Sequence, residues 1–227
     1  MPVALFRLLP MFASVWLAVA SCAACSLPKL TEWRGFSHAQ HVQFLKEFWQ
    51  REPLLIRSLL SAEELESHCP LRPHEVVEMA LEPDARARII QESGGKRGPW
   101  QLSQQPFDDS QLQDLYKVRN QLEADADCEA VSSSRDRWTV LIQEVDQHTP
   151  EVEALRERFS FVPRWRVDDV MVSYAPPGGS VGAHLDSYDV FLVQGSGTRE
   201  WSIESQPRAL ADEQLKPGLE VRSMLKL

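Results

Sequence analysis

The most constraining feature of this sequence is the change of texture at Arg166. From there onward, short runs rich in β-branched and aromatic residues alternate with clusters of glycine and proline, a pattern typical of short strands joined by turns. The expected strands are Val167–Tyr174, Asp189–Gln194 and Arg199–Ile203. The intervening turns are Pro176-Pro177-Gly178-Gly179 and Gly195-Ser196-Gly197-Thr198. The C-terminal part of the chain is therefore expected to fold as β structure.

The part of the chain before Arg166 is mainly helical by its apolar spacing. We expect helices over His38–Trp49, Ala62–His68, His74–Leu81, 107–128 and Pro150–Phe159, and strands over Leu54–Ile56, Arg86–Gln91 and Trp138–Ile142. In the first helix Val42, Leu45, Phe48 and Trp49 form the expected apolar face. A capping box of Ser61 and Glu64 opens the second. The layout predicts an α+β fold with helices first and a β structure at the C-terminal end.

The first 26 residues differ from the rest, because Arg7 is their only charged residue and the stretch is strongly apolar. This is the layout of a targeting segment, and Val19–Cys22 fits a lipoprotein cleavage box. Organelle targeting, export with a lipid anchor on Cys22, and a misplaced start all remain open. The expected division is a leader over 1–26, a mainly helical part over 27–130 and a β part over 131–227, so that the folded domain begins near Leu27.

Charge and cysteine content exclude several classes of function. The formal net charge is −9, from 33 acidic and 24 basic residues, which is unlike a protein that holds nucleic acid by its phosphates. No direct DNA binding is expected. An acidic surface suits a basic protein segment as partner, although it also simply keeps a protein soluble. Cys22 and Cys25 have CxxC spacing, but no second pair follows, so a zinc site is not predicted.

The segment with chemical information is Gly178–Asp186, which ends in His184-Leu185-Asp186. In an extended chain, residues two apart point to the same face, so His184 and Asp186 present an imidazole and a carboxylate side by side. Such a pair can supply two corners of the 2-His-1-carboxylate triad of non-haem iron(II) oxygenases. The spacing alone is weak evidence, because a hydrogen-bonded strand pair has the same pattern. The glycines before it permit a close approach of the backbone to the site.

A hairpin is expected directly after this pair, with Arg199 at the head of the returning strand. A guanidinium there suits the far carboxylate of a dicarboxylate co-substrate. If Asp186 to Gln194 formed one straight strand, Arg199 would lie roughly 26 Å from the metal at ~3.3 Å per residue. The hypothesis therefore requires a sharp bend between Asp186 and Val190 that moves the chain to the facing sheet, as in a jelly roll.

These motifs resemble one family. The matching runs are Trp165–Tyr174, Pro177-Gly178-Gly179, His184-Leu185-Asp186, Tyr188–Phe191, Gln194-Gly195 and, near the N-terminus, Phe48–Leu54. They resemble the cupin-type ribosomal oxygenases, JmjC-fold enzymes that hydroxylate side chains of ribosomal proteins, over about Leu27 to Leu227. The resemblance implies a double-stranded β-helix (jelly roll), Fe(II) held by His184 and Asp186, and 2-oxoglutarate held through its distal carboxylate by Arg199. It also implies an intracellular enzyme with a protein substrate, an arginine or histidine hydroxylase, and a homodimer.

One element of the family pattern has no match. The family's second iron-binding histidine follows the hairpin, whereas no histidine follows His184 here; the others, His38, His41, His68, His74 and His148, precede it and are expected to pack or face solvent. The jelly roll is thus expected to be incomplete, with an open sheet edge, weak iron binding and little turnover. The alternative hypothesis is a non-catalytic cupin-like binding module that has lost its metal site.

Overall fold

The computed structural model describes most of the chain after residue 30 and a few short strands outside it. The described residues are 3–8, 16–17, 30–61, 63–64, 71–92, 100–124, 137–182, 184–186, 188–203, 213–215 and 222–224. The Cys22–Cys25 motif, the 93–99 loop and most of the approach to residue 222 lie outside these ranges.

Helices and strands alternate along the described chain before the β-rich end. The strands are β1 (Val3–Leu8), β2 (Trp16–Leu17), β3 (Thr31–Arg34), β4 (Leu54–Arg57), β5 (Ala87–Glu92), β6 (Trp100–Gln104), β7 (Arg137–Ile142), β8 (Val167–Tyr174), β9 (His184–Leu185), β10 (Val190–Gln194), β11 (Glu213–Leu215) and β12 (Arg222–Met224). The helices are α1 (His38–Glu47), α3 (Pro73–Met79), α4 (Asp109–Ala124) and α5 (Pro150–Arg156), with 3₁₀ turns η1 (Val145–Gln147), η2 (Glu157–Phe159) and η3 (Arg164–Arg166).

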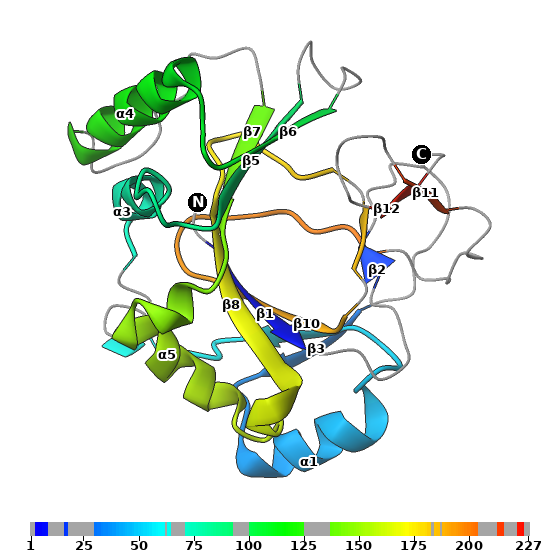
Figure 1. The fold of residues 1–227 in the computed structure, drawn as a ribbon. Helices are drawn as coiled ribbons and strands as arrows, with labels where there is room; N and C mark the ends of the chain where they lie inside the picture. The colour runs from blue at the N-terminus through cyan, green and yellow to red at the C-terminus, as the bar shows by residue number, and fades with distance from the viewer. Residues whose placement is uncertain are drawn as a thin grey trace.

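Two antiparallel sheets form the centre of the molecule. A six-stranded sheet has the order β10-β1-β8-β7-β5-β6, and a four-stranded sheet has the order β11-β12-β9-β2. Helices α3, α4 and α5 lie on one side of the larger sheet, and the smaller sheet lies on the other (Figure 1). A separate parallel pair joins β3 to β4. The predicted α+β layout, helices first and β structure at the C-terminal end, is confirmed.

The larger sheet buries different residues on its two faces because side chains alternate along each strand. Val170 and Val172 of β8, with Val140 of β7, pack in the main core together with Leu155 of α5 and Val76 of α3. The opposite face carries a smaller apolar cluster, which consists of Ile90, Leu141 and Met171 with Trp100, Leu102 and Val181 packed against it. This second face is the one turned toward the four-stranded sheet, so it is the face on which the site is built.

Helix α1 forms where the sequence predicts it but buries a different face. Phe44 and Phe48 are buried, whereas Val42 is 59% exposed and Leu45 is 40% exposed, so the expected apolar face was wrong in these two residues. The reason is a group of aromatic rings: Phe44 packs against Phe161 and Phe191, and rings bury more area than aliphatic side chains do. The helix turns its aromatic residues inward and leaves the smaller aliphatic ones in solvent.

Most of the other predicted elements are present with boundaries shifted by one to a few residues. The capping box is confirmed, since the Glu64 backbone N–H donates to Ser61 Oγ (3.1 Å) and the Ser61 N–H donates to a Glu64 carboxylate oxygen (2.8 Å). Strands β3 and β6 were not predicted. The expected strand over Arg199–Ile203 is not formed, as these residues have no regular secondary structure.

The N-terminal segment differs from its expected role as a leader outside the fold. Strand β1 lies between β8 and β10 and pairs antiparallel with both, with Phe6 opposite Val170 on one side and Phe191 on the other. Strand β2 pairs with β9, which places Leu17 opposite His184. A β-prone apolar segment satisfies the backbone groups of two strand edges that would otherwise lack partners, which is the physical reason for this placement.

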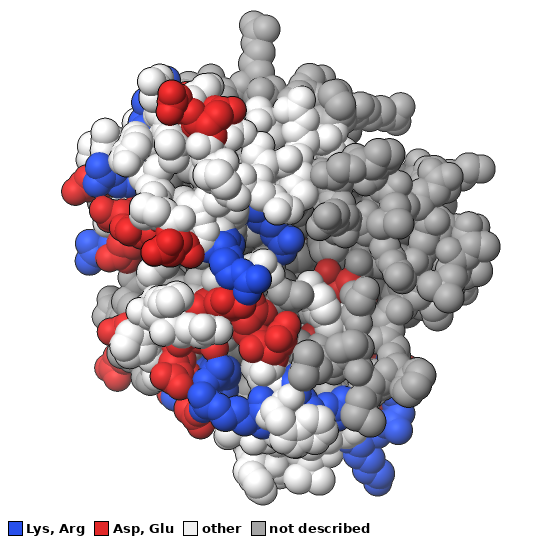
Figure 2. All heavy atoms as spheres, in the orientation of Figure 1, with Lys and Arg blue, Asp and Glu red and all other residues white. Residues whose placement is uncertain are grey.

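Charged side chains of both signs are interspersed over the helical side of the molecule (Figure 2). A cavity of about 450 Å³ on that side is lined mainly by acidic and apolar residues: Leu71, Glu75, Glu78, Met79, Glu82, Thr149 and Glu151. It belongs to α3 and the start of α5, not to the strands that carry His184. Within the described residues no helix is long and apolar enough to cross a membrane.

Candidate functional site

A corner in the chain places the candidate metal ligands. His184 lies in β9 of the four-stranded sheet, and four residues after Asp186 the chain enters β10 of the six-stranded sheet. The bend expected between Asp186 and Val190 is therefore present, and it moves the chain from one sheet to the other.

The corner is fastened to the N-terminal part of the molecule through Asp189, which is only 5% exposed. Gln50 Nε2 donates a hydrogen bond to Asp189 Oδ2 (2.8 Å). Burial raises the pKa of Asp189, while the hydrogen bond from Gln50 and the nearby charge of Arg166 act in the opposite direction. Arg166 also lies over the ring of Trp49, 5.5 Å from its centroid. The Phe48–Leu54 motif thus packs against the loop that follows the His-x-Asp pair.

The His184 and Asp186 side chains lie on the same side of the chain, as their spacing predicts. His184 Nε2 is 3.6 Å from Asp186 Oδ1, and the two side chains are 17% and 20% exposed. His184 Nδ1 lies 3.0 Å from the carbonyl oxygen of Gly182. Because a carbonyl oxygen only accepts, Nδ1 carries the proton, and Nε2 is left to face the carboxylate. This is how a backbone carbonyl sets the tautomer of a metal-binding histidine.

The electrostatics of the pair favour positive charge. Burial alone would lower the pKa of His184, but the hydrogen bond and charge of Asp186 outweigh it, so the pKa is raised above its ordinary value. The positive charge of Arg88 acts against this rise. The pair thus favours positive charge, and a bound metal ion would supply it in competition with the proton.

Two glycines before the pair allow the backbone to approach the sheet closely, as predicted. A Cβ atom at Gly179 would overlap the carbonyl oxygen of Trp138, and one at Gly182 would lie 3.0 Å from the ring of Trp100. Gly182 also has a φ of +76°, which L-residues rarely adopt. The loop that leads to His184 therefore lies directly on the second face of the sheet.

Arg199, the third candidate residue, is half-buried and follows the turn after β10. Its guanidinium lies over the ring of Trp201, 5.7 Å from the centroid, and burial lowers its pKa. Asp186 therefore lies before the corner, and Arg199 lies after it, on the segment that follows β10. A role in binding the co-substrate stays a prediction for Arg199.

The residues present fit part of a metal site. His184 and Asp186 offer one nitrogen and one carboxylate oxygen that converge, which are suitable ligands for Fe(II). In the described part of the chain, no group of three or more His, Cys, Asp or Glu side chains is arranged to hold a metal ion. The structure thus brings together two candidate ligands and supplies no third within the described ranges.

Sequence reasoning missed two residues that this geometry makes relevant. Gln50 holds the corner, and its only local signal was its place in the Phe48–Leu54 motif. Arg88 lies in β5 on the face turned toward His184. The sequence could have indicated this, because Arg88 and the buried Ile90 are two residues apart in the strand Ala87–Glu92 and therefore point to the same face.

The sequence is similar to that of several known proteins. A family model for the JmjC domain matches residues 154–226. A probable ribosomal oxygenase of Haemophilus influenzae is 35% identical over 179 residues, which cover 79% of this chain and 38% of that protein. The ribosomal protein uL16 3-hydroxylase of Escherichia coli is 29% identical over 192 residues, covering 77% of this chain and 44% of that protein.

Among solved structures, that of E. coli ycfD is similar, with 25% identity and a TM-score of 0.40 over 61% of this chain and 30% of that one. The chain spans less than half the length of the curated relatives it matches. The resemblance predicted from the sequence, to JmjC-type ribosomal oxygenases, is confirmed by the family model and the two curated relatives.

Proposed function

We propose, from the similarity of this chain to the JmjC-type ribosomal oxygenases, that it carries part of the active site of an Fe(II)- and 2-oxoglutarate-dependent protein hydroxylase. The observation that carries the proposal is the convergence of His184 Nε2 and Asp186 Oδ1 at 3.6 Å, with His184 Nδ1 fixed on the carbonyl of Gly182. A His-x-Asp pair with a preset tautomer is prepared to bind a divalent metal ion.

In this function the residues of the chain would bind and orient the metal ion and the co-substrate. His184 and Asp186 would hold the iron, and Arg199 would hold the distal carboxylate of 2-oxoglutarate. The bound metal and co-substrate supply the oxygen-activating chemistry. The Gln50–Asp189 hydrogen bond fixes the corner from which Asp186 projects, and the apolar cluster around Met171 excludes water from the neighbouring sheet face.

The proposed substrate is a side chain of a ribosomal protein, of the arginine or histidine type. The support is the naming of the two relatives, one a probable ribosomal oxygenase and the other a hydroxylase of ribosomal protein uL16. The formal net charge of −9 suits the approach of a basic ribosomal protein.

A second candidate function is a non-catalytic cupin-like binding module. The observation that favours it is the lack of a third candidate ligand near His184 and Asp186 among the described residues. Such a module would keep the two sheets and the Gln50–Asp189 contact and bind its partner without metal.

The test measures Mn(II) binding and succinate formation from 2-oxoglutarate with added Fe(II). We expect Mn(II) to bind the wild-type chain, and to bind His184→Ala and Asp186→Ala at least tenfold more weakly. Asp168→Ala is the matched control, since it removes an exposed carboxylate from β8. Equal Mn(II) binding by the wild type and Asp186→Ala would contradict the proposal and leave the binding module as the better description.

A further inference from the structure

Gln50 lies just after helix α1 in a backbone conformation that few residues other than glycine adopt. Its φ is +56°, in the left-handed region. Directly after it, the N–H groups of Arg51 and Glu52 both donate to the carbonyl oxygen of Phe48, at 2.8 and 3.0 Å, so the chain turns sharply at this point. Glycine is the usual left-handed residue after a helix, because a Cβ atom is strained in that conformation. A glutamine at this position therefore destabilises the turn locally.

The side chain of Gln50 makes a contact that glycine could not make. Its Nε2 atom donates a hydrogen bond of 2.8 Å to Oδ2 of Asp189, which lies 139 positions further along the chain. Asp189 is 5% exposed, and a buried carboxylate requires hydrogen-bond donors. The strained turn and the long-range contact thus occur at the same residue. Backbone strain persists where the surrounding structure requires it, and such positions are concentrated at functional sites.

The residue before Gln50 packs against the same corner of the chain. The ring centroids of Trp49 and Phe191, the second residue of β10, are 5.9 Å apart. Arg166 lies over the Trp49 ring, and its positive charge acts on Asp189. Two consecutive residues after α1 therefore contact the chain at the point where it enters β10. The hydrogen bond of Gln50 is part of a packed interface and not an isolated contact at the surface.

The position of Asp186 depends on how this corner is held at its two ends. On one side, the strand β9 that contains His184 is fixed by its pairing with β2 and β12. On the other side, Asp189 is held by Gln50, and β10 begins at the next residue. Asp186 and Asp189 are three positions apart in the sequence. A displacement of Asp189 therefore moves Asp186, and binding sites tolerate displacements of only about 0.5 Å.

We infer that Gln50 is a positioning residue for the candidate metal pair, because its amide holds Asp189 and thereby the corner from which Asp186 meets His184. The strained turn after α1 is the local cost of this contact. The inference rests on the proposed function and deepens it, since it assigns the support of one proposed metal ligand to the N-terminal half of the chain. Gln50 acts through Asp189, so its removal should alter metal affinity without removing a ligand.

The test compares two truncations of Gln50 that differ in backbone strain. Gln50→Ala and Gln50→Gly both remove the amide, but glycine also relieves the left-handed turn, so Gln50→Gly should be the more stable variant in urea unfolding. Mn(II) affinity of the 227-residue chain is measured in the absence of denaturant, from the electron paramagnetic resonance signal of the unbound ion. We expect both variants to bind Mn(II) about tenfold more weakly than the wild type, the lower end of the loss that follows removal of a supporting partner. Equal weakening at unequal stability distinguishes positioning of the ligand from a general loss of folding.

A pair of substitutions that reverses the hydrogen bond provides a rescue. Gln50→Glu keeps the length of the side chain but removes its N–H donor and places a carboxylate against that of Asp189, so Mn(II) affinity should fall at least as far as in Gln50→Ala. Adding Asp189→Asn restores a hydrogen bond with donor and acceptor exchanged, because the asparagine amide can donate to the glutamate. The double variant should recover to within about threefold of the wild-type affinity.

Two controls separate this contact from its surroundings. Gln43→Ala removes an exposed amide of α1 that donates to Glu47, and Ser58→Gly relieves another left-handed residue, with a φ of +54°. Neither change should alter Mn(II) affinity. Unchanged affinity of Gln50→Ala and Gln50→Gly, weakening that follows the loss of stability, or no recovery in the double variant overturns the inference while the proposed function stands. Failure of the wild-type chain to bind Mn(II) overturns the proposed function, and the inference with it.

Discussion

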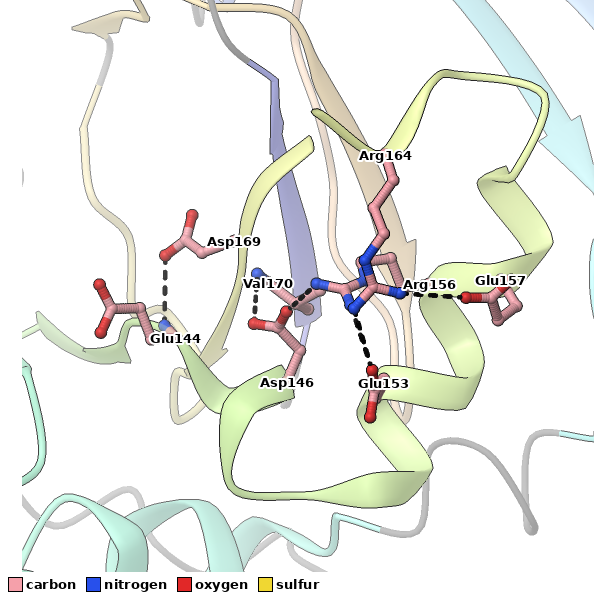
Figure 3. Close-up of polar contacts among 8 residues, drawn as sticks. All are labelled: Glu144, Asp146, Glu153, Arg156, Glu157, Arg164, Asp169 and Val170. Carbon is pink, nitrogen blue, oxygen red and sulfur yellow. Dashed lines mark hydrogen bonds and ion pairs between the residues drawn. The ribbon is translucent and has the colours of Figure 1, made fainter. Parts of the chain in front are cut away.

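Replacing Asp146 by alanine should be one of the most destabilising single changes in this protein. Asp146 lies in the 3₁₀ turn η1 and is 5% exposed. Its Oδ1 accepts a hydrogen bond from the backbone N–H of Val170 (2.9 Å), and its Oδ2 is paired with Arg156, whose side chain is 12% exposed. Figure 3 shows the carboxylate between the two partners. One side chain therefore ties α5 and η1 to β8.

The magnitude follows from what alanine would leave behind. The Val170 N–H would lose its acceptor inside the protein, which costs about 1–3 kcal/mol. Among the described residues, Arg156 would keep the ion pair with Glu153 at 3.3 Å, so a nearly buried cation would lose its main partner. Removing one member of a buried ion pair costs about 3–5 kcal/mol in all. We expect the free energy of unfolding to fall by about this amount.

Urea unfolding measures the change, provided that the slope m stays constant between variants. Arg164→Ala is the matched control, because it breaks ion pairs with Glu153 and Glu157 at a side chain that is 67% exposed, and such pairs contribute about 0–1 kcal/mol. The double variant Asp146→Ala with Arg156→Met should cost less than the sum of the single changes. Equal losses for Asp146→Ala and Arg164→Ala, or strict additivity, would refute the reasoning.

Three further predictions concern pH and the N-terminal strand. The pKa of Asp189 is raised in the folded protein, so the contribution of its protonated form to stability is fully present below the ordinary value of 3.8 and is lost as the pH rises through the folded-state value. The stability of the wild type relative to Asp189→Asn should therefore increase as the pH falls from about 7 toward about 4 in unfolding measurements. A difference that stays constant with pH would contradict this. Metal binding requires neutral His184, whose pKa is raised, so Mn(II) affinity should already begin to fall above the ordinary value of 6.5 as the pH is lowered. An affinity independent of pH would argue against His184 as a ligand. Deleting residues 2–26 removes β1 from between β8 and β10 and should lower the midpoint of thermal unfolding by several degrees or more. A loss of about 1 kcal/mol in stability corresponds to a fall of roughly 2–8 °C. An unchanged midpoint would instead support the interpretation of this segment as a leader outside the fold.

The local pattern of the sequence was enough to predict most of the helices and strands and the candidate metal-binding pair. The helices over α1, α3, α4 and α5, the strands β7, β8 and β10, and the Ser61–Glu64 capping box follow from spacing within a few residues. His184 and Asp186 lie together because the period of an extended chain is two, which needs no distant partner. The sharp bend after them was also predictable, since a single straight strand would separate Asp186 from Arg199 too far.

Only the tertiary structure decided which faces and edges meet. Val42 and Leu45 have helical spacing, yet contacts with Phe161 and Phe191, more than a hundred residues away, turn Phe44 inward instead. Gln50 reaches Asp189 across 139 positions of the sequence, and β1 inserts between two strands from the other end of the chain. Periodicity states which residues share a face, because it is a property of the local backbone. What that face packs against depends on contacts between distant segments, and these fix the position of the Asp189 corner that follows the His184–Asp186 pair.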